Sequence, residues 1–366
     1  MTVDIQEFLR VAIMIIIGTI GLALFGIVFG LLYKGVDRKI SAHMQGRIGP
    51  PIVQPFRDIR KLFTKENIVP DNAVPWVFHM APLIGLVATI SILLYLPIGG
   101  FEPLASGYGD LILILYLLII PSLALVIGGF ASGSPYATVG AQREMATMIS
   151  YEFPLAIIIL TLAWRLSISQ ISNPFVITSV TTTPIWGIVG PLGFIGFILL
   201  LLALIIVTPA ELSKIPFDAP EAETEIGGGL LVEYSGRNLG MFYLMDSVKT
   251  IVMASIIVTL FFPYNLSNFV GLEAGSYSAF AVDIVFYLIK VLIVIIFSVS
   301  LIRVAVARLK IDQIVYTYWV PITLMALIGL ILVMWGEWTM NDHMISIFGQ
   351  EVKWTAWPTI AQMLGL

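Results

Sequence analysis

The stretch VAIMIIIGTIGLALFGIVFGLL, residues 11–32, decides the fold, because it is long, apolar and free of charged side chains. A helix rises 1.5 Å per residue, so about 20 apolar residues cross the roughly 30 Å of hydrocarbon in a bilayer. The whole chain agrees: its 366 residues have a mean hydropathy of +0.98, and only 11% of them are charged. The sequence therefore predicts an all-α integral membrane protein.

Seven further stretches complete a predicted single membrane domain, 1–366, of about eight transmembrane helices with large cytoplasmic loops. The spans are predicted near residues 11–32, 77–97, 111–130, 146–166, 188–208, 239–262, 281–302 and 315–335. The loops expected on one side are 33–75, 131–145, 209–238 and 303–314. The first span is too long for a signal peptide and lacks a small-residue cleavage site, so we expect it to be retained.

Lys and Arg concentrate in these four loops, and short cytoplasmic loops collect such residues. The loop 33–75 alone holds Lys34, Arg38, Lys39, Arg47, Arg57, Arg60, Lys61 and Lys65. The opposite side keeps Arg10, Arg165 and Lys353. This distribution predicts cytoplasmic loops and places both termini outside.

Two spans have charged residues that their length forces into the membrane. The apolar run after Glu152, Phe153 to Trp164, has only 12 residues and cannot cross alone. The run after Lys249 is similarly short, so Asp246 and Lys249 are drawn in as well.

The seventh span adds two more charges, with Asp283 at its start and Lys290 near its middle. Intramembrane charges rarely persist without a partner or an aqueous path. Two interpretations stay open. The charges are structural pairs, Asp246 with Lys249 and Asp283 with Lys290, or they are steps of an ion path.

An acidic stretch, IPFDAPEAETEI at 215–226, lies in the third predicted loop. Pro220 suits the first turn of a helix, and the glycines at 227–229 would end it. Such a helix would place Glu221 and Glu225 on one face and Glu223 on the other. It is either a solvated helix whose charges match the helix dipole or the mouth of an ion path.

Composition limits the chemistry of the chain itself. It contains no cysteine, so it holds neither a thiolate-ligated iron–sulfur cluster nor a disulfide. Its three histidines, His43, His79 and His343, have no ligand spacing. We therefore expect no cofactor, no metal and no nucleic-acid partner, and redox chemistry falls to other subunits.

Three blocks resemble the H-subunit family of respiratory complex I, called NADH dehydrogenase subunit 1 in mitochondria. The blocks are DRKISAHMQGRIGPPIVQPFRDIRKLFTKENIVP (37–70), GAQREMATMISYEFPL (140–155) and AELSKIPFDAPEAETEIGGGLLVEYSGRNLGMFYL (210–244). The resemblance implies a non-catalytic core subunit in a prokaryotic cell membrane. Its loops would hold a hydrophilic redox module with iron–sulfur clusters and a possible [NiFe] centre. Its helices would begin an ion path toward antiporter-like membrane subunits.

Two departures from complex I point to one branch of this family. The segment GPPIVQPFRD is shorter than its complex I counterpart, and Lys214 stands where complex I members have Arg. Those segments line the quinone chamber in complex I, so we expect no quinone site in this chain. The resemblance is then to subunits of ferredoxin-linked, membrane-bound [NiFe] hydrogenase and sulfane sulfur reductase complexes. The alternatives are a quinone-site subunit of a complex I-type dehydrogenase and a stand-alone secondary ion transporter.

The candidate residues fall into two groups. For the path of protons or sodium we expect Glu152, Glu211, Asp218, Glu221, Glu223, Glu225, Glu233, Asp246, Lys249, Asp283 and Lys290. For docking of the redox module we expect Arg38, Arg47, Pro50, Pro51, Phe56, Lys214 and Arg237. For the basic first loop, binding to lipid headgroups is an alternative or additional role.

Overall fold

The computed structural model describes the backbone of residues 5–107, 109–169, 171, 173–272, 276–342, 345–347 and 350–352. Side chains are described within these ranges from Ile13 to Glu337. The side chain of Arg10, together with His343, Lys353 and both chain termini, lies outside the described residues.

Within the described residues, eight helices are long and apolar enough to cross a membrane, which confirms the predicted all-α membrane fold. Five of the spans are the single helices α3 (Pro75–Leu93), α4 (Asp110–Ala131), α5 (Pro135–Ile168), α7 (Pro191–Glu211) and α9 (Gly236–Phe261). The first span is α1 (Ile5–Met44). The seventh comprises α11 (Tyr277–Ile295), the π-helical turn η4 (Ile296–Ser300) and α12 (Leu301–Ala305). The eighth comprises α13 (Ile311–Thr317), the π-helical turn η5 (Tyr318–Ile322) and α14 (Thr323–Asp342).

Short elements connect the spans. They are α2 (Gln54–Thr64), α6 (Ile177–Thr182), η1 (Ile185–Gly187), η2 (Ala219–Glu221), α8 (Glu223–Ile226), η3 (Gly229–Leu231) and α10 (Leu266–Val270). A small antiparallel hairpin, β1 (Ile345–Ile347) and β2 (Gln350–Val352), follows α14.

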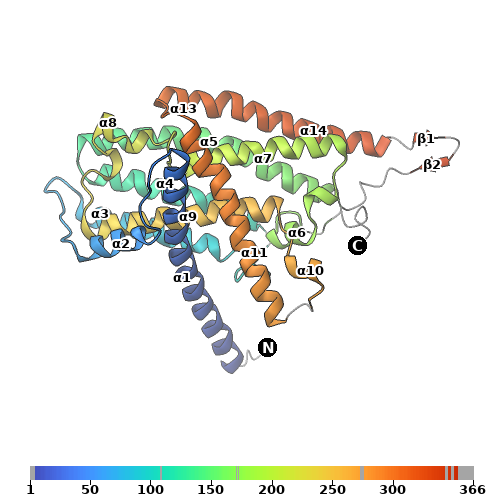
Figure 1. Ribbon diagram of the computed structural model, residues 1–366, viewed down its shortest axis with the longest axis horizontal. Helices are drawn as coiled ribbons and strands as arrows, with labels where there is room; N and C mark the ends of the chain where they lie inside the picture. Colours follow the sequence, from blue (N-terminus) through green and yellow to red (C-terminus); the bar gives the residue numbers. More distant parts are fainter. Residues whose placement is uncertain are drawn as a thin grey trace.

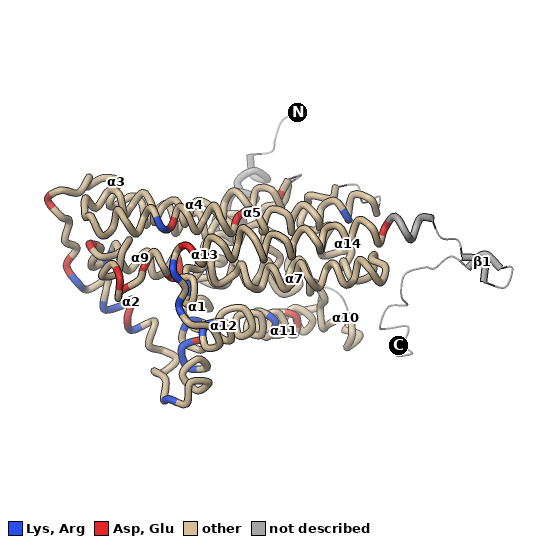
Figure 2. Tube along the Cα trace, turned by 90° about the horizontal axis from the view of Figure 1, so that it is seen from above, with Lys and Arg blue, Asp and Glu red and all other residues tan. Residues whose placement is uncertain are grey.

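Six spans, α3, α4, α5, α7, α9 and α14, run side by side, whereas α1 and α11 cross them obliquely (Figure 1). We call the end of the bundle that carries residues 45–74, 212–235 and 306–310 the loop end. Many of the Lys and Arg residues gather toward this end (Figure 2).

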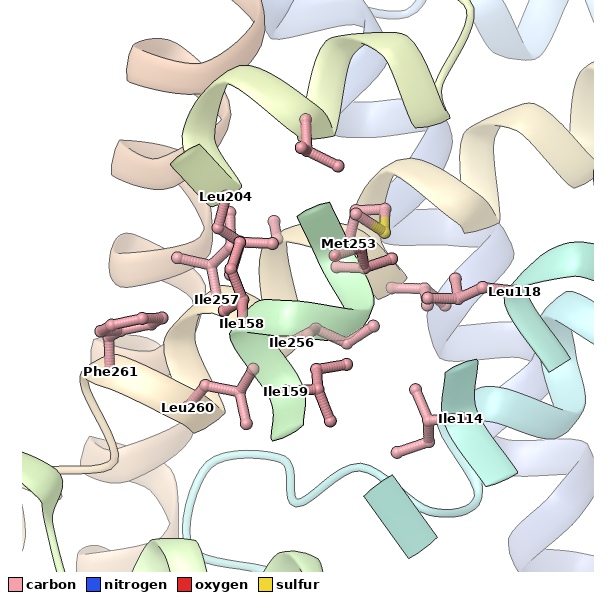
Figure 3. Packing of buried hydrophobic residues seen from close by; sticks show 14 of the residues in the cluster. Ile114, Leu118, Ile158, Ile159, Leu204, Met253, Ile256, Ile257, Leu260 and Phe261 are labelled. Carbon is pink, nitrogen blue, oxygen red and sulfur yellow. The ribbon is translucent and has the colours of Figure 1, made fainter. Parts of the chain in front are cut away.

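Helix α9 is the centre of the bundle. Every residue from Ser247 to Phe261 is buried, and α9 packs against α1, α2, α3, α7 and α11. Figure 3 shows part of this core, where Met253, Ile256 and Leu260 of α9 meet Ile158 and other apolar side chains from α4, α5 and α7. Because protein surrounds this buried part of α9, any charge there must find its partner within the bundle.

Helix α1 crosses α9 closely where Gly30 lies against Ser247. A Cβ atom on Gly30 would come within 2.6 Å of the Ser247 carbonyl oxygen. The missing side chain therefore permits the crossing that brings Lys34, one turn further along α1, toward α9.

Two helices extend into segments that we expected to be loops. Helix α1 continues to Met44, well past the predicted end at 32, and α5 begins at Pro135, inside the expected loop 131–145. Apolar content marks only the part of a helix that crosses hydrocarbon. These extensions remain helical because they pack on the protein, which buries polar residues such as Ser41 and Glu144.

The acidic stretch is not the single helix that the sequence predicted. It forms the short turns η2 and α8, separated by Ala222 in an extended conformation (φ −63°, ψ 101°). Glu221 and Glu225 therefore do not share a helical face, and they have different neighbours.

Candidate functional site

Helix α9 brings Asp246 and Lys249, one turn apart, to a small cavity near the loop end. The cavity has a volume of about 50 Å³, enough for a few water molecules. Its polar lining consists of Glu211, Ser213, Lys214, Glu221, Tyr243, Asp246 and Lys249. Several titratable side chains thus share one water-sized space beside the central helix.

The inner side of the cavity is an ion pair between Glu211 and Lys249. The two atoms Oε1 and Nζ are 2.8 Å apart, and the side chains are only 2% and 5% exposed. Lys249 also donates to Ser122 Oγ at 3.0 Å, and that hydroxyl lies 3.2 Å from the Tyr151 hydroxyl. Four spans, α4, α5, α7 and α9, therefore meet in one buried polar network.

The outer side is a cluster in which one carboxylate faces two lysines. Asp246 accepts a hydrogen bond from Lys34 of α1 at 2.7 Å and another from Lys214, in the loop after α7, at 2.6 Å. The Lys34 ammonium also lies 5.2 Å from the centre of the Tyr243 ring. The cluster carries a formal net positive charge and is more exposed than the inner pair.

Glu221 lies on the cavity wall between the acidic stretch and these lysines. Burial raises the pKa of Glu221 to about 7, although the positive charge of Lys214 acts in the opposite direction. A carboxyl group with this pKa changes its protonation state near neutral pH.

Helix α5 adds two carboxyl groups on adjoining faces. Glu144 is buried and accepts a 3.4 Å hydrogen bond from Ser213, but its Oε1 has no hydrogen-bond partner among the described residues. Glu152, two turns further along, is half-buried, and its Oε1 likewise has no described partner. Both groups can bind a proton, because neither is held as a carboxylate by an ion pair with a described residue.

Neither pairing offered by helical spacing, Asp246 with Lys249 or Asp283 with Lys290, forms an ion pair among the described residues. Asp246 and Lys249 bond to Lys34, Lys214 and Glu211 rather than to each other. Spacing along one helix misses partners that other helices supply.

At the opposite end, Asp283 accepts from the backbone and hydroxyl of Ser267 at 2.8 and 2.6 Å. Lys290 donates to the carbonyls of Phe262 and Tyr264, just beyond the end of α9. A cation there complements the carboxyl end of the helix dipole. The structure brings neither residue to the cavity.

The other carboxylates of the acidic stretch lie outside the cavity. Glu225 forms an ion pair with Arg143 at 2.6 Å, and Asp218 is bound by Arg308, whose Nε donates to it at 2.8 Å. Glu223 is exposed, and Glu233, which follows the stretch, is half-buried. Arg143 and Arg308 thus fasten the stretch beside the cavity.

The residues expected for docking are distributed over the loop end. Arg47, Pro50, Pro51 and Arg237 are exposed, and Phe56 is half-buried. Arg38 pairs with Asp58 at 3.2 Å, which ties α1 to α2. Lys214 belongs to the Asp246 cluster instead of an exposed surface.

Sequence reasoning missed Lys34, Ser122 and Glu144. The first predicted span ends just before Lys34 and the fourth begins just after Glu144, so hydropathy places both residues in loops. A helical stripe through Glu144, Met148 and Tyr151, all buried, would have shown that α5 begins earlier. No pattern along the sequence pairs Ser122 with Lys249.

Comparisons with known proteins agree with this architecture. Residues 16–334 match the NADH dehydrogenase family. The H-subunit of F(420)H(2) dehydrogenase from Methanosarcina mazei is 31% identical over 349 residues, covering 90% of this chain and 96% of that protein. Hydrogenase-4 component C of Escherichia coli is 33% identical over 302 residues, covering 81% of this chain and 89% of that protein.

A solved structure of the membrane-bound sulfane sulfur reductase (MBS), an archaeal respiratory membrane complex, contains a similar chain. The TM-score is 0.75 at 27% identity, with coverage of 87% of this chain and 99% of that one. The resemblance inferred from the three sequence blocks is confirmed. The chain therefore belongs to the NADH dehydrogenase family, that of the membrane H-subunits of complex I-like oxidoreductases, which includes hydrogenase and sulfane sulfur reductase relatives.

Proposed function

We propose that this chain is a cofactor-free membrane subunit that docks a hydrophilic redox module and couples electron transfer to proton or sodium translocation. Its relatives, named as subunits of a dehydrogenase and a hydrogenase and found in a sulfur reductase complex, support a redox assembly. The observation that carries the coupling role is the cavity where Glu221, the Asp246 cluster and the Glu211–Lys249 pair meet.

The cavity can respond to charge because it is small, partly buried and lined by several ionisable groups. In a low-dielectric setting, a change of charge at a docked redox module shifts the proton affinity of nearby carboxyl groups. Glu221 is the first such group, and Lys214, Asp246 and Lys34 pass the change toward Glu211 and Lys249. Glu144 and Glu152 of α5 then lead from this network toward neighbouring membrane subunits.

The loop end is the docking face for the redox module in this proposal, and it faces the cytoplasm. Ile48 is 99% exposed between Arg47 and the exposed prolines 50 and 51. An exposed apolar side chain beside Arg and rigid Pro fits a protein partner better than water. Ferredoxin-linked hydrogenase and sulfur-reductase complexes are the branch we favour.

The test separates electron transfer from ion movement in the purified complex. Glu144→Gln and Glu152→Gln preserve side-chain shape but remove the titratable group. We expect each variant complex to assemble and transfer electrons in detergent, and to build a much smaller ion gradient in liposomes.

Glu337→Gln is the matched control. Glu337 lies in the eighth span and forms an ion pair with Arg165 of α5, away from the cavity. It should leave the ratio of gradient to electron transfer unchanged in whatever complex assembles. Full gradients in both assembled α5 variants would exclude the proposed path from the cavity through α5. Quinone-dependent turnover would favour the alternative complex I-type function.

A further inference from the structure

A second, larger hollow lies on the outer surface of α1, away from the charged cavity. It is an open groove of about 400 Å³, lined by Val36, Lys39, Ile40, His43 and Met44 of α1 and by Ile52 from the following loop. This volume lies within the range of sites that hold small molecules. Nothing in the proposed coupling network uses these side chains.

The apolar wall of the groove continues the outer surface of the first span. Residues four apart form a ridge along a helix, and the ridge Leu24, Val28 and Leu32 is exposed by 58%, 47% and 36%. The next members of the same series are Val36 and Ile40, which line the groove. An apolar chain lying on α1 could therefore pass from the hydrocarbon region into the groove without crossing a polar surface.

The rim of the groove carries the Lys39 ammonium group and the His43 ring, which can bind a ligand. Lys39 is exposed and forms no ion pair among the described residues, whereas the nearby Asp37 and Asp58 are bonded to Arg303 and Arg38. His43 Nδ1 lies 2.8 Å from the Lys39 carbonyl. Because a carbonyl only accepts, Nδ1 is the donor, and in the neutral ring Nε2 is left to accept from a ligand hydroxyl.

We propose that this groove binds an anionic phospholipid of the surrounding membrane. Its hydrocarbon chain lies against Val36, Ile40, Met44 and Ile52, its phosphate is bound by Lys39, and a headgroup hydroxyl donates to His43 Nε2. Charge complementarity and continuity with the exposed face of the first span identify the occupant. The apolar ridge continues into the hydrocarbon region, where a lipid chain lies and a water-soluble redox module does not. Basic residues beside a membrane span attract anionic headgroups.

The experiment uses the intact complex in nanodiscs of phosphatidylcholine with a minor fraction of phosphatidylglycerol whose chain carries a photoactivatable group. After illumination, peptide mass spectrometry measures crosslinks to residues 36–52. We expect crosslinking there to exceed that of a matched phosphatidylcholine probe, and Lys39→Gln to reduce it about fivefold, the equivalent of about 1 kcal/mol for one basic residue.

Two further variants control for charge and folding. Lys39→Arg keeps the charge and should retain the crosslink, and Lys61→Gln, which removes an exposed charge from α2, should leave it unchanged. Equal labelling by both lipids, or an unaltered crosslink in Lys39→Gln, would overturn the proposal. So would crosslinking of the groove to a protein subunit without lipid labelling. The readout does not depend on ion translocation.

Discussion

The residue that most constrains this molecule is Lys249, because its ammonium group lies inside the bundle and must be neutralised there. Glu211 of α7 neutralises it, and the Ser122 hydroxyl of α4 accepts a further hydrogen bond from it. Breaking a buried ion pair on one side leaves the other charge without compensation, which typically costs about 3–5 kcal/mol. The pair is therefore a requirement of the fold, whatever part it takes in ion movement.

We predict that Lys249→Met alone lowers the amount of assembled complex sharply, because it leaves Glu211 buried without its cation. The double variant Lys249→Met with Glu211→Gln should recover much of the assembly, since both charges are removed. Quantitative blotting of the detergent-extracted complex measures this. Equal losses in the single and double variants would contradict the ion-pair explanation.

Glu221 predicts a pH dependence of stability. Its pKa rises from 4.5 to about 7 on folding, so the folded protein holds a proton that the unfolded chain has released. Stability contributed by this group is therefore full below pH 4.5 and falls as the pH rises through 7. The loss is on the order of 1–3 kcal/mol.

Glu221→Gln should remove that loss. Its thermal midpoint in the complex should match the parent near pH 4.5 and exceed it above pH 7. Glu223→Gln, which removes one exposed carboxylate from the same stretch, is the control for the loss of a negative charge. A constant difference between Glu221→Gln and the parent across this range would contradict the prediction.

At the residue scale, the sequence predicted which charged residues lie in the membrane zone but not which residues form ion pairs with them. Span length alone placed Glu152, Asp246 and Lys249 in the membrane zone. Their partners depend on which helices pack against α9, and that information is tertiary. The expected neighbour of Asp246 was Lys249, one turn away. Its actual partners, Lys34 and Lys214, are 212 and 32 residues distant.

At the scale of elements, the close crossing of α1 and α9 determines the site geometry. Gly30 permits it, and any side chain there would meet backbone atoms of Ser247. A flexible side chain can move aside, but a carbonyl in a buried helix cannot move without disturbing its own hydrogen bond. The crossing sets the position of Lys34 opposite Asp246.

Gly30→Ala should therefore destabilise the complex by about 1–3 kcal/mol, as overpacking does. Gly21→Ala in the same helix is the control, because no atom lies within 4 Å of its added Cβ. Thermal inactivation of electron transfer measures both. Equal tolerance of the two substitutions would mean that α1 does not pack on α9 as described.

The helices also show why apolar runs predicted the membrane spans but misplaced the boundaries of the loops. Hydropathy marks runs that are long and apolar enough to cross hydrocarbon, and eight such helices lie among the described residues, as predicted. It does not report helix extensions that pack on protein, such as the last turns of α1 and the first turns of α5. The prediction of a single helix for the acidic stretch was wrong because contacts with other segments determine its conformation. Arg143 and Arg308 hold it as two short turns, although its composition allows one helix.

At the scale of the whole molecule, the charged network lies toward one end of a bundle whose centre is apolar. Beyond Lys249, α9 carries only uncharged side chains to Phe261. No row of charged groups thus continues along α9, and transfer from the cavity must proceed sideways. Ion transfer from the cavity therefore depends on which side of the membrane the loop end faces and on whether a redox module covers it.

The cysteine-free sequence makes both features directly measurable, since one introduced cysteine is the only thiol in the chain. Glu223 is exposed at the loop end, and Tyr277 is 94% exposed at the start of α11, at the other end. If the basic loops are cytoplasmic, a membrane-impermeant maleimide should label Tyr277→Cys in intact cells. It should label Glu223→Cys only in inverted vesicles.

Removing the hydrophilic subunits from those vesicles should then accelerate labelling of Glu223→Cys and leave Tyr277→Cys unaffected, because a docked module shields the acidic stretch. Reversed sidedness would refute the orientation. Unchanged labelling of Glu223→Cys after removal of those subunits would instead show that no module covers the cavity, and would separate its proton chemistry from electron transfer.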